Sequence, residues 1–76
     1  MPHIEIKCYP GRTEEQKKKC AEEVTKAITE SFGCDASSVS IAIKEIEKAD
    51  WKKEVWDAQI VPDNNILYKK PGYNCD

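Results

Sequence analysis

The residue best suited to do chemistry in this sequence is a proline in the second position. Initiator methionine is generally removed when a small residue follows it, so the mature chain is expected to begin with the secondary amine of Pro2. A free α-amino group titrates near ~7.7–8.0, and an apolar pocket or a neighbouring cation lowers that value. Such an amine can act as a base near neutral pH. The alternative interpretation is that Pro2 merely precedes a strand.

Arg12 is the second candidate, because it is the only arginine among 12 basic residues. A guanidinium group at the start of a helix can hold a carboxylate through two parallel hydrogen bonds. About ten residues of extended chain separate Pro2 from Arg12, however. A site that uses both residues would therefore need Arg12 from another subunit or a chain that folds back.

An alternating segment follows Pro2 and is expected to position it. In residues 3–9, Ile4, Ile6 and Cys8 alternate with polar residues, and this period of two predicts a half-buried strand. The pair Pro10-Gly11 then predicts a turn, which leads directly to Arg12.

A helix is expected to follow this turn and to run to about Ser31. Thr13 and Gln16 have the spacing of a capping box, and Gly33 is the residue type that commonly follows a helix end. Apolar residues recur at steps of three and four and should form one buried stripe. They are Cys20, Ala21, Val24, Ala27, Ile28 and Phe32. The charged residues of this segment, Lys17 among them, are interpreted as a solvated face.

A second alternating segment, residues 37–46, predicts another strand. A strand, a long helix and a strand form a βαβ unit, in which the strands are parallel and the crossover is right-handed. After it, Asp50 is expected to cap a short helix that carries Trp51, Val55 and Trp56. The predicted fold is therefore α+β, with two parallel strands, one long helix and short C-terminal helices.

The length of 76 residues predicts a single domain over residues 1–76 with a thin core. A two-stranded sheet under one helix is not stable alone in water, because one sheet face and the strand edges stay uncovered. Assembly of several copies of the chain is the simplest completion.

Composition excludes several classes of partner and site. The net charge is −2 with acidic and basic residues intermixed, so we expect no nucleic-acid partner, and no apolar run is long enough for a membrane span. No secretory pattern is evident, which favours the cytoplasm.

The cysteines lack the close pairing of a zinc site. We expect mainly free thiols, with disulfides as the alternative, and neither a metal nor a cofactor. The cysteines are Cys8, Cys20, Cys34 and Cys75.

Three segments together resemble the 4-oxalocrotonate tautomerase family, whose short chains begin with proline and work as oligomers of βαβ units. They are residues 2–9, residues 11–17, which open the helix, and residues 37–43 in the second strand. Residues 55–58 and 69–73 are similar to the dimeric branch, which acts on enols such as phenylenolpyruvate. The resemblance implies a homodimer in preference to a hexamer, and a small enol or keto acid as substrate.

The resemblance also implies roles for four residues. The family's base falls on Pro2 and its first carboxylate-binding arginine falls on Arg12. Its second arginine falls on Ser40, which cannot supply that charge, so dicarboxylate substrates are not expected. Its aromatic wall falls on Trp51, which would exclude water; plain core packing is the alternative for this residue.

The reaction implied is an enol–keto tautomerisation without a cofactor, in which Pro2 moves a proton and Arg12 holds the carboxylate. Two alternatives stay open. A Pro2-dependent dehalogenase, hydratase or decarboxylase would need further acidic residues to activate water, and only Glu5 is a candidate. A non-catalytic oligomeric binding module is the other alternative.

Overall fold

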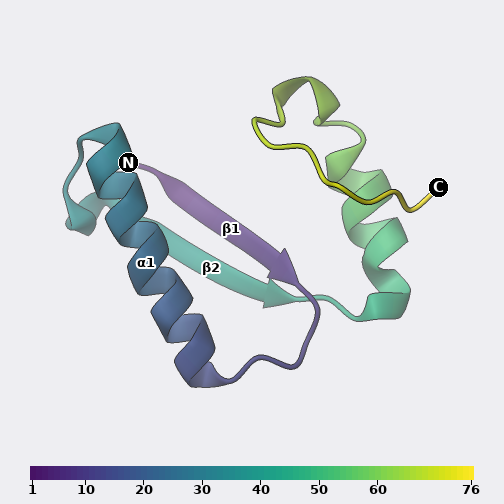
Figure 1. Ribbon diagram of the computed structural model, residues 1–76, viewed down its shortest axis with the longest axis horizontal. Coiled ribbons are helices and arrows are strands. Elements are labelled where there is room, and N and C mark those ends of the chain that lie inside the picture. Colours follow the sequence, from purple (N-terminus) through teal and green to yellow (C-terminus); the bar gives the residue numbers. More distant parts are fainter. The chain divides into compact units, whose positions relative to one another are not determined.

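A computed structural model describes residues 1–76, which form two compact units, Met1–Glu45 and Ile46–Asp76. The first unit contains β1 (His3–Cys8), α1 (Glu14–Phe32), the short 3-10 helix η1 (Ala36–Ser38) and β2 (Ser40–Glu45). The second unit contains η2 (Lys48–Asp50), η3 (Lys52–Ile60) and η4 (Asn64–Ile66). The predicted fold class is confirmed: two parallel strands, one long helix and short C-terminal helices (Figure 1).

The two strands pair in parallel with His3 opposite Ser40 and Ile6 opposite Ile43. Ile6 and Ile43 line a hollow shared with residues of α1, so the isoleucine face of the sheet is the one that α1 covers. The opposite face carries the polar residues of β1. There Lys44 lies 3.1 Å from Glu5, and Lys7 lies 3.7 Å from the same carboxylate.

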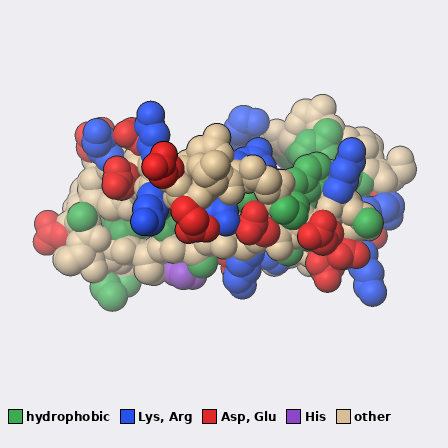
Figure 2. All heavy atoms as spheres, turned by 90° about the horizontal axis from the view of Figure 1, so that it is seen from below, with side chains coloured by type: hydrophobic (Ala, Val, Ile, Leu, Met, Phe, Trp, Pro, Cys, Tyr) green, Lys and Arg blue, Asp and Glu red, His purple; other side chains and the backbone are tan.

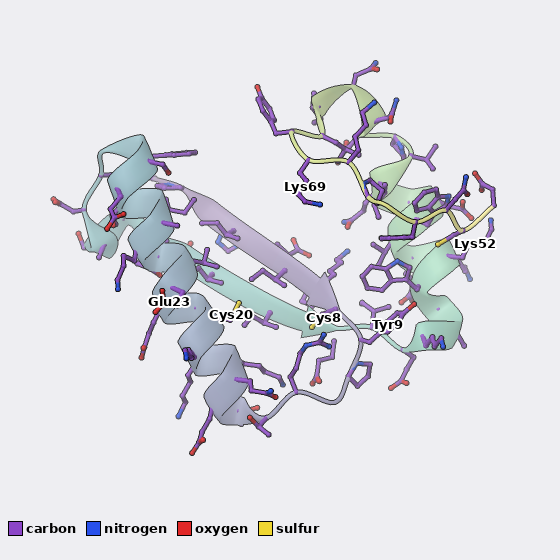
Figure 3. All side chains as sticks on the ribbon, in the orientation of Figure 1. Cys8, Tyr9, Cys20, Glu23, Lys52 and Lys69 are labelled. Carbon is purple, nitrogen blue, oxygen red and sulfur yellow. The ribbon has the colours of Figure 1, made fainter.

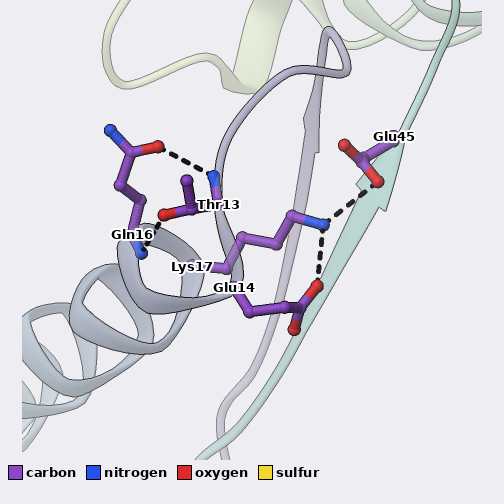
Figure 4. Close-up of polar contacts among 5 residues, drawn as sticks. All are labelled: Thr13, Glu14, Gln16, Lys17 and Glu45. Atoms are coloured by element: carbon purple, nitrogen blue, oxygen red, sulfur yellow. Dashed lines mark hydrogen bonds and ion pairs between the residues drawn. The ribbon is translucent and has the colours of Figure 1, made fainter.

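Capping residues set both ends of α1, as the sequence pattern predicted. The N–H of Gln16 donates to the Thr13 hydroxyl at 3.1 Å, and the N–H of Thr13 donates to the Gln16 side chain at 2.8 Å (Figure 4). This reciprocal pair satisfies two backbone donors that the first turn of a helix leaves free. Gly33 ends the helix at φ 69° and ψ 42°, a left-handed conformation that glycine adopts without steric cost.

The predicted apolar stripe of α1 is only partly correct. Ala21, Val24 and Ile28 are half-buried, whereas Cys20, Ala27 and Phe32 are exposed, with Phe32 at 69%. These residues stay exposed because a sheet of two strands is too narrow to cover the whole apolar face of α1. The apolar surface that stays open on α1 fits a subunit that is completed by assembly.

The second strand begins later than the prediction of residue 37. Residues 36–38 form η1 instead, and the Ser38 hydroxyl donates to the Asp35 carbonyl at 2.8 Å. Serine side chains commonly bond to nearby backbone and thereby favour turns over strands. The first strand likewise ends at Cys8 and does not include Tyr9.

The expectation that Asp50 caps the following helix is wrong. The chain becomes helical at Lys48, and Asp50 belongs to η2 and makes no capping bond. Trp51 then connects η2 to η3 with helical angles of φ −58° and ψ −48°, so no residue there has the extended backbone of an N-cap. The element η3 is a π-helix of 9 residues, and its wide turns bring Lys52 within 3.0 Å of Asp57, five positions later.

The core of the second unit is Val55 and Trp56, at 5% and 7% exposure. The Trp56 indole N–H donates to Asp76 at 3.2 Å, and the Tyr73 ring lies 5.5 Å from the Trp56 ring. The C-terminal residues are thereby held against η3. No residue of the first unit reaches this degree of burial.

The sheet has two strands, so β1 and β2 each have one edge without a partner strand. Figure 2 shows acidic and basic side chains interspersed on the face it presents, without a large patch of one sign. All four cysteines are unpaired. No helix of the chain is long and apolar enough to cross a membrane.

Candidate active site

Pro2 lies directly before β1 and is anchored through its own carbonyl. The backbone N–H of Ser40 donates to that carbonyl at 3.2 Å, which extends the pairing of the two strands by one residue. Pro2 is half-buried, whereas Met1 is fully exposed. Pro2 therefore lies at the end of the sheet where both strands begin.

His3 and Ser40 form a side-chain pair at the same end of the sheet. The His3 ring nitrogen Nδ1 lies 2.6 Å from the Ser40 hydroxyl, and the two residues are register partners. The structure therefore brings Ser40 together with Pro2. The sequence pattern did not predict this bond, because it depends on the register of the two strands.

Arg12 lies at the opposite end of β1. Gly11 forms the turn after β1 with a φ of 122°, a backbone conformation that residues other than glycine rarely adopt. The Arg12 guanidinium donates to the Tyr9 carbonyl at 3.1 Å. The six residues of β1 rise about 3.3 Å each, so roughly 20 Å of strand separates Pro2 from this turn. One chain alone does not bring Pro2 and Arg12 together, as the sequence had indicated.

A cavity of about 230 Å³ lies at the Arg12 end of the first unit. Its walls come from both strands, the turn and the first two turns of α1. The lining residues are Ile6, Cys8, Arg12, Gln16, Lys17, Cys20 and Ile43. Isoleucine side chains with two cationic groups suit a small ligand that has an apolar body and a carboxylate.

Lys17 contributes to this cavity and was wrongly interpreted as a member of a solvated helix face. Its ammonium group donates to Glu45 at 3.0 Å and lies 3.4 Å from Glu14, and its side chain is only 20% exposed (Figure 4). The hydrogen bond to Glu45, opposed by partial burial and supported by Glu14, raises the pKa of Lys17. Lys17 therefore stays protonated, and the carboxylates of Glu14 and Glu45 balance its charge. Arg12 takes part in none of the ion pairs, so no carboxylate of the chain balances its charge.

Trp51 belongs to the second unit, at the junction of η2 and η3. Its indole N–H donates to the Tyr73 hydroxyl at 3.3 Å, and the residue is half-buried. A second cavity, of about 240 Å³, lies in this unit between Trp56, Ile60, Val61, Asn64, Leu67 and Pro71. It contains no side chain that could transfer a proton at neutral pH. The candidate chemistry therefore lies in the first unit.

The sequence matches the family described as Tautomerase enzyme over residues 2–55. It is 43% identical to Tautomerase PptA of Enterobacter sp. (strain 638) over 75 residues, which cover 97% of this chain and 99% of that protein. Its identity to Tautomerase PptA of Escherichia coli (strain K12) is also 43%, over 77 aligned positions that cover 100% of this chain and 99% of that protein.

Solved structures agree with these relatives. A 4-oxalocrotonate tautomerase isozyme from Methylibium petroleiphilum superposes with a TM-score of 0.63 at 38% identity, over 66% of this chain and 81% of that chain. YwhB, a homologue of 4-oxalocrotonate tautomerase, superposes with a TM-score of 0.60 at 36% identity, over 62% of this chain and 77% of that chain. The fold and these likenesses define a tautomerase, an isomerase that moves a proton within a small molecule. The chain belongs to the tautomerase family that includes 4-oxalocrotonate tautomerase.

Proposed function

We propose that this tautomerase converts small enol acids, of the 2-hydroxyalkenoate or enolpyruvate type, into their keto acids. The amine of Pro2, freed by removal of Met1, is the general acid and base. The family match begins at Pro2, and Pro2 is the first residue of the chain that is hydrogen-bonded to β2. This coincidence is the observation that carries the proposal.

The free edge of β1 supplies the second half of the site. Because the Pro2 carbonyl points toward β2, the backbone groups of His3, Glu5 and Lys7 point to the free edge. Two copies of β1 related by a two-fold axis parallel to the strand would place each N–H opposite the N–H of the other copy, and no hydrogen bond could form. A two-fold axis perpendicular to the sheet places N–H opposite C=O, so only this axis lets two β1 strands pair. The paired strands are then antiparallel, and Pro2 lies beside the partner's Cys8 end and turn. We therefore propose a homodimer with two identical sites.

The partner's Arg12 and the cavity beside it then receive the substrate. Arg12 holds the carboxylate, and its positive charge favours the neutral form of the Pro2 amine. The amine takes the proton from the enol hydroxyl, the new carbonyl forms, and the former alkene carbon receives a proton. No electrons leave the substrate, so the reaction needs no cofactor. Acid–base catalysis by a positioned group typically contributes about 10²–10⁴-fold.

The serine at position 40 supports a substrate with one carboxylate. Its hydroxyl is within 2.6 Å of His3, and it provides no fixed charge for a second carboxylate. From the likeness to the family, Trp51 is proposed as an apolar wall that excludes water, and residues 1–76 are proposed as a single tautomerase domain. The free cysteines favour a reducing compartment, and we propose the cytoplasm.

The test is enol ketonisation by the Pro2→Ala variant, with phenylenolpyruvate as substrate and intact mass as a check that Met1 is absent. We expect kcat/KM to fall by about 10²–10⁴-fold while circular dichroism is unchanged. The matched control, His3→Gln, keeps the secondary amine of Pro2. Full activity in Pro2→Ala would refute this secondary amine as the base, and turnover of halogenated acrylates in preference to enols would replace tautomerisation with dehalogenation.

A further inference from the structure

Two thiols line the cavity of about 230 Å³ that contains Arg12, and the proposed proton transfer uses neither of them. Cys8 comes from the end of β1 and Cys20 comes from the second turn of α1. Figure 3 shows Cys20 pointing from the helix toward the sheet, with Cys8 at the last residue of β1. Thiols are good nucleophiles toward soft, conjugated carbon atoms, and this cavity also holds a cation that suits a carboxylate.

Cys8 is the better placed of the two thiols. The Arg12 guanidinium is bonded to the carbonyl of Tyr9, the residue next to Cys8, at 3.1 Å. The Lys17 ammonium is bonded at 3.0 Å to Glu45, which is the register partner of Cys8. Both cationic groups are thus anchored at immediate neighbours of Cys8.

Cys20 follows Lys17 by three positions, about one turn of α1, so the cation nearest to it in sequence is the one that Glu14 and Glu45 neutralise. Cys20 is seven positions after the capping residue Thr13, which corresponds to about 10 Å along the axis of α1. It is also exposed, whereas Cys8 is half-buried. Cys20 therefore provides an internal comparison within the same cavity.

We propose that Cys8 is a covalent modification site for small α,β-unsaturated keto acids, which Arg12 binds through their carboxylate. The thiol gives up its proton, and the sulfur electron pair forms a bond to the β-carbon. The alkene pair moves onto the carbonyl oxygen as an enolate, which takes a proton at the α-carbon. Neither an oxidant nor a leaving group is needed, and the adduct is a thioether.

A cavity of about 230 Å³ is large enough to hold an acid of this size. The adduct occupies the place beside Arg12 where a carboxylate substrate binds, so modification of Cys8 stops turnover. This last consequence rests on the proposed function. The modification itself does not, because it depends only on the thiol, the cavity and the guanidinium.

The experiment uses trans-4-oxo-2-pentenoic acid and its methyl ester as matched probes on the full-length protein, with peptide mapping by mass spectrometry. We expect the acid to label Cys8 about tenfold faster than Cys20, and the ester to show little preference between them. Arg12→Gln should reduce the preference of the acid for Cys8 over Cys20 to that of the ester. Equal labelling of Cys20, Cys34 or Cys75 by the acid, or the same preference for Cys8 with acid and ester, would overturn the proposal.

Two variants separate this proposal from the proposed function. Pro2→Ala should keep the labelling of Cys8 although its tautomerase activity falls, and loss of the labelling in this variant would instead assign the reaction to Pro2. Cys8→Ser should leave only the slower labelling of Cys20 in the cavity. If Cys8→Ser fails to fold, the map of the native protein decides the question alone.

Discussion

The carbonyl oxygen of Pro2 accepts a hydrogen bond of 3.2 Å from the backbone N–H of Ser40. The residue proposed as base is thereby fixed to the start of β2, at the end of the sheet opposite to Arg12. This opposition is the main constraint on the active site. A substrate can meet both residues only where two chains meet.

Two inactive variants should therefore restore activity when their subunits mix. In a Pro2→Ala and Arg12→Gln heterodimer, one site has both native residues and the other has neither. Random exchange makes half of the dimers mixed, so the recovered activity should be about a quarter of the native value. The measurement is kcat per subunit after equimolar co-refolding, with each variant refolded alone as the control. Absence of recovery in a verified heterodimer would place Pro2 and Arg12 in separate functions.

Ser40→Arg should widen the substrate range toward dicarboxylates. The new guanidinium adds a partner for a second carboxylate at the Pro2 end of the sheet, at the expense of the 2.6 Å contact with His3. We expect the ratio of kcat/KM for a dicarboxylate enol to that for phenylenolpyruvate to rise by about tenfold. Ser37→Arg, an exposed substitution in η1, is the matched control. An equal rise in both variants would show that only net charge matters.

Thr13→Ala should destabilise the protein through loss of the capping box. The Thr13 hydroxyl accepts the Gln16 N–H at 3.1 Å, and its removal leaves that donor without its protein partner. We expect a loss of about 1 kcal/mol in the free energy of unfolding, measured by chemical denaturation at fixed protein concentration. Thr29→Ala is the control, since its hydroxyl bonds to Lys26 inside the helix, and its effect should be smaller.

Acid should destabilise the sheet through Glu5. The hydrogen bond from Lys44, together with the charges of Lys44 and Lys7, lowers the pKa of Glu5 from its ordinary 4.5. A lowered pKa means that the folded state prefers the carboxylate, so this stability is present above pH 4.5 and is lost as pH falls through the folded-state pKa.

Thermal unfolding between pH 7 and pH 3 measures this dependence. Glu5→Gln should show a shallower fall in Tm below pH 4.5 than the native chain. Glu22→Gln changes a carboxylate of α1 that is in no ion pair and should retain the native slope. A native slope in Glu5→Gln would mean that other carboxylates govern acid stability.

Local patterns predicted the architecture of the first unit well. The alternation around Ile4 and Ile6 and the pair Thr13 and Gln16 depend on neighbours within a few positions, so a single sequence contains them. The start of β2 was missed because serine side chains bond locally and form η1. The short helix that carries Val55 and Trp56 was predicted, but its π-helical form was not, because its apolar residues recur at a spacing that an α-helix shares.

The candidate site was less accessible to sequence reasoning. Pro2 and Arg12 were found by residue type, since an amine and a lone guanidinium are rare in so short a chain. Lys17 was missed because its contact with Glu45 spans 28 positions, and the His3–Ser40 pair spans 37. Contacts of this kind depend on the register of two strands, which alternation alone does not determine.

The unpaired edges of β1 and β2 make protein concentration a part of the stability of this enzyme. In the proposed dimer, the chain gains folding free energy by mass action, so its Tm should rise with the concentration of chain. Dilution should then separate Pro2 from the partner's Arg12 and expose the sheet edge in one step. Loss of structure and loss of activity should therefore share one midpoint on a dilution series.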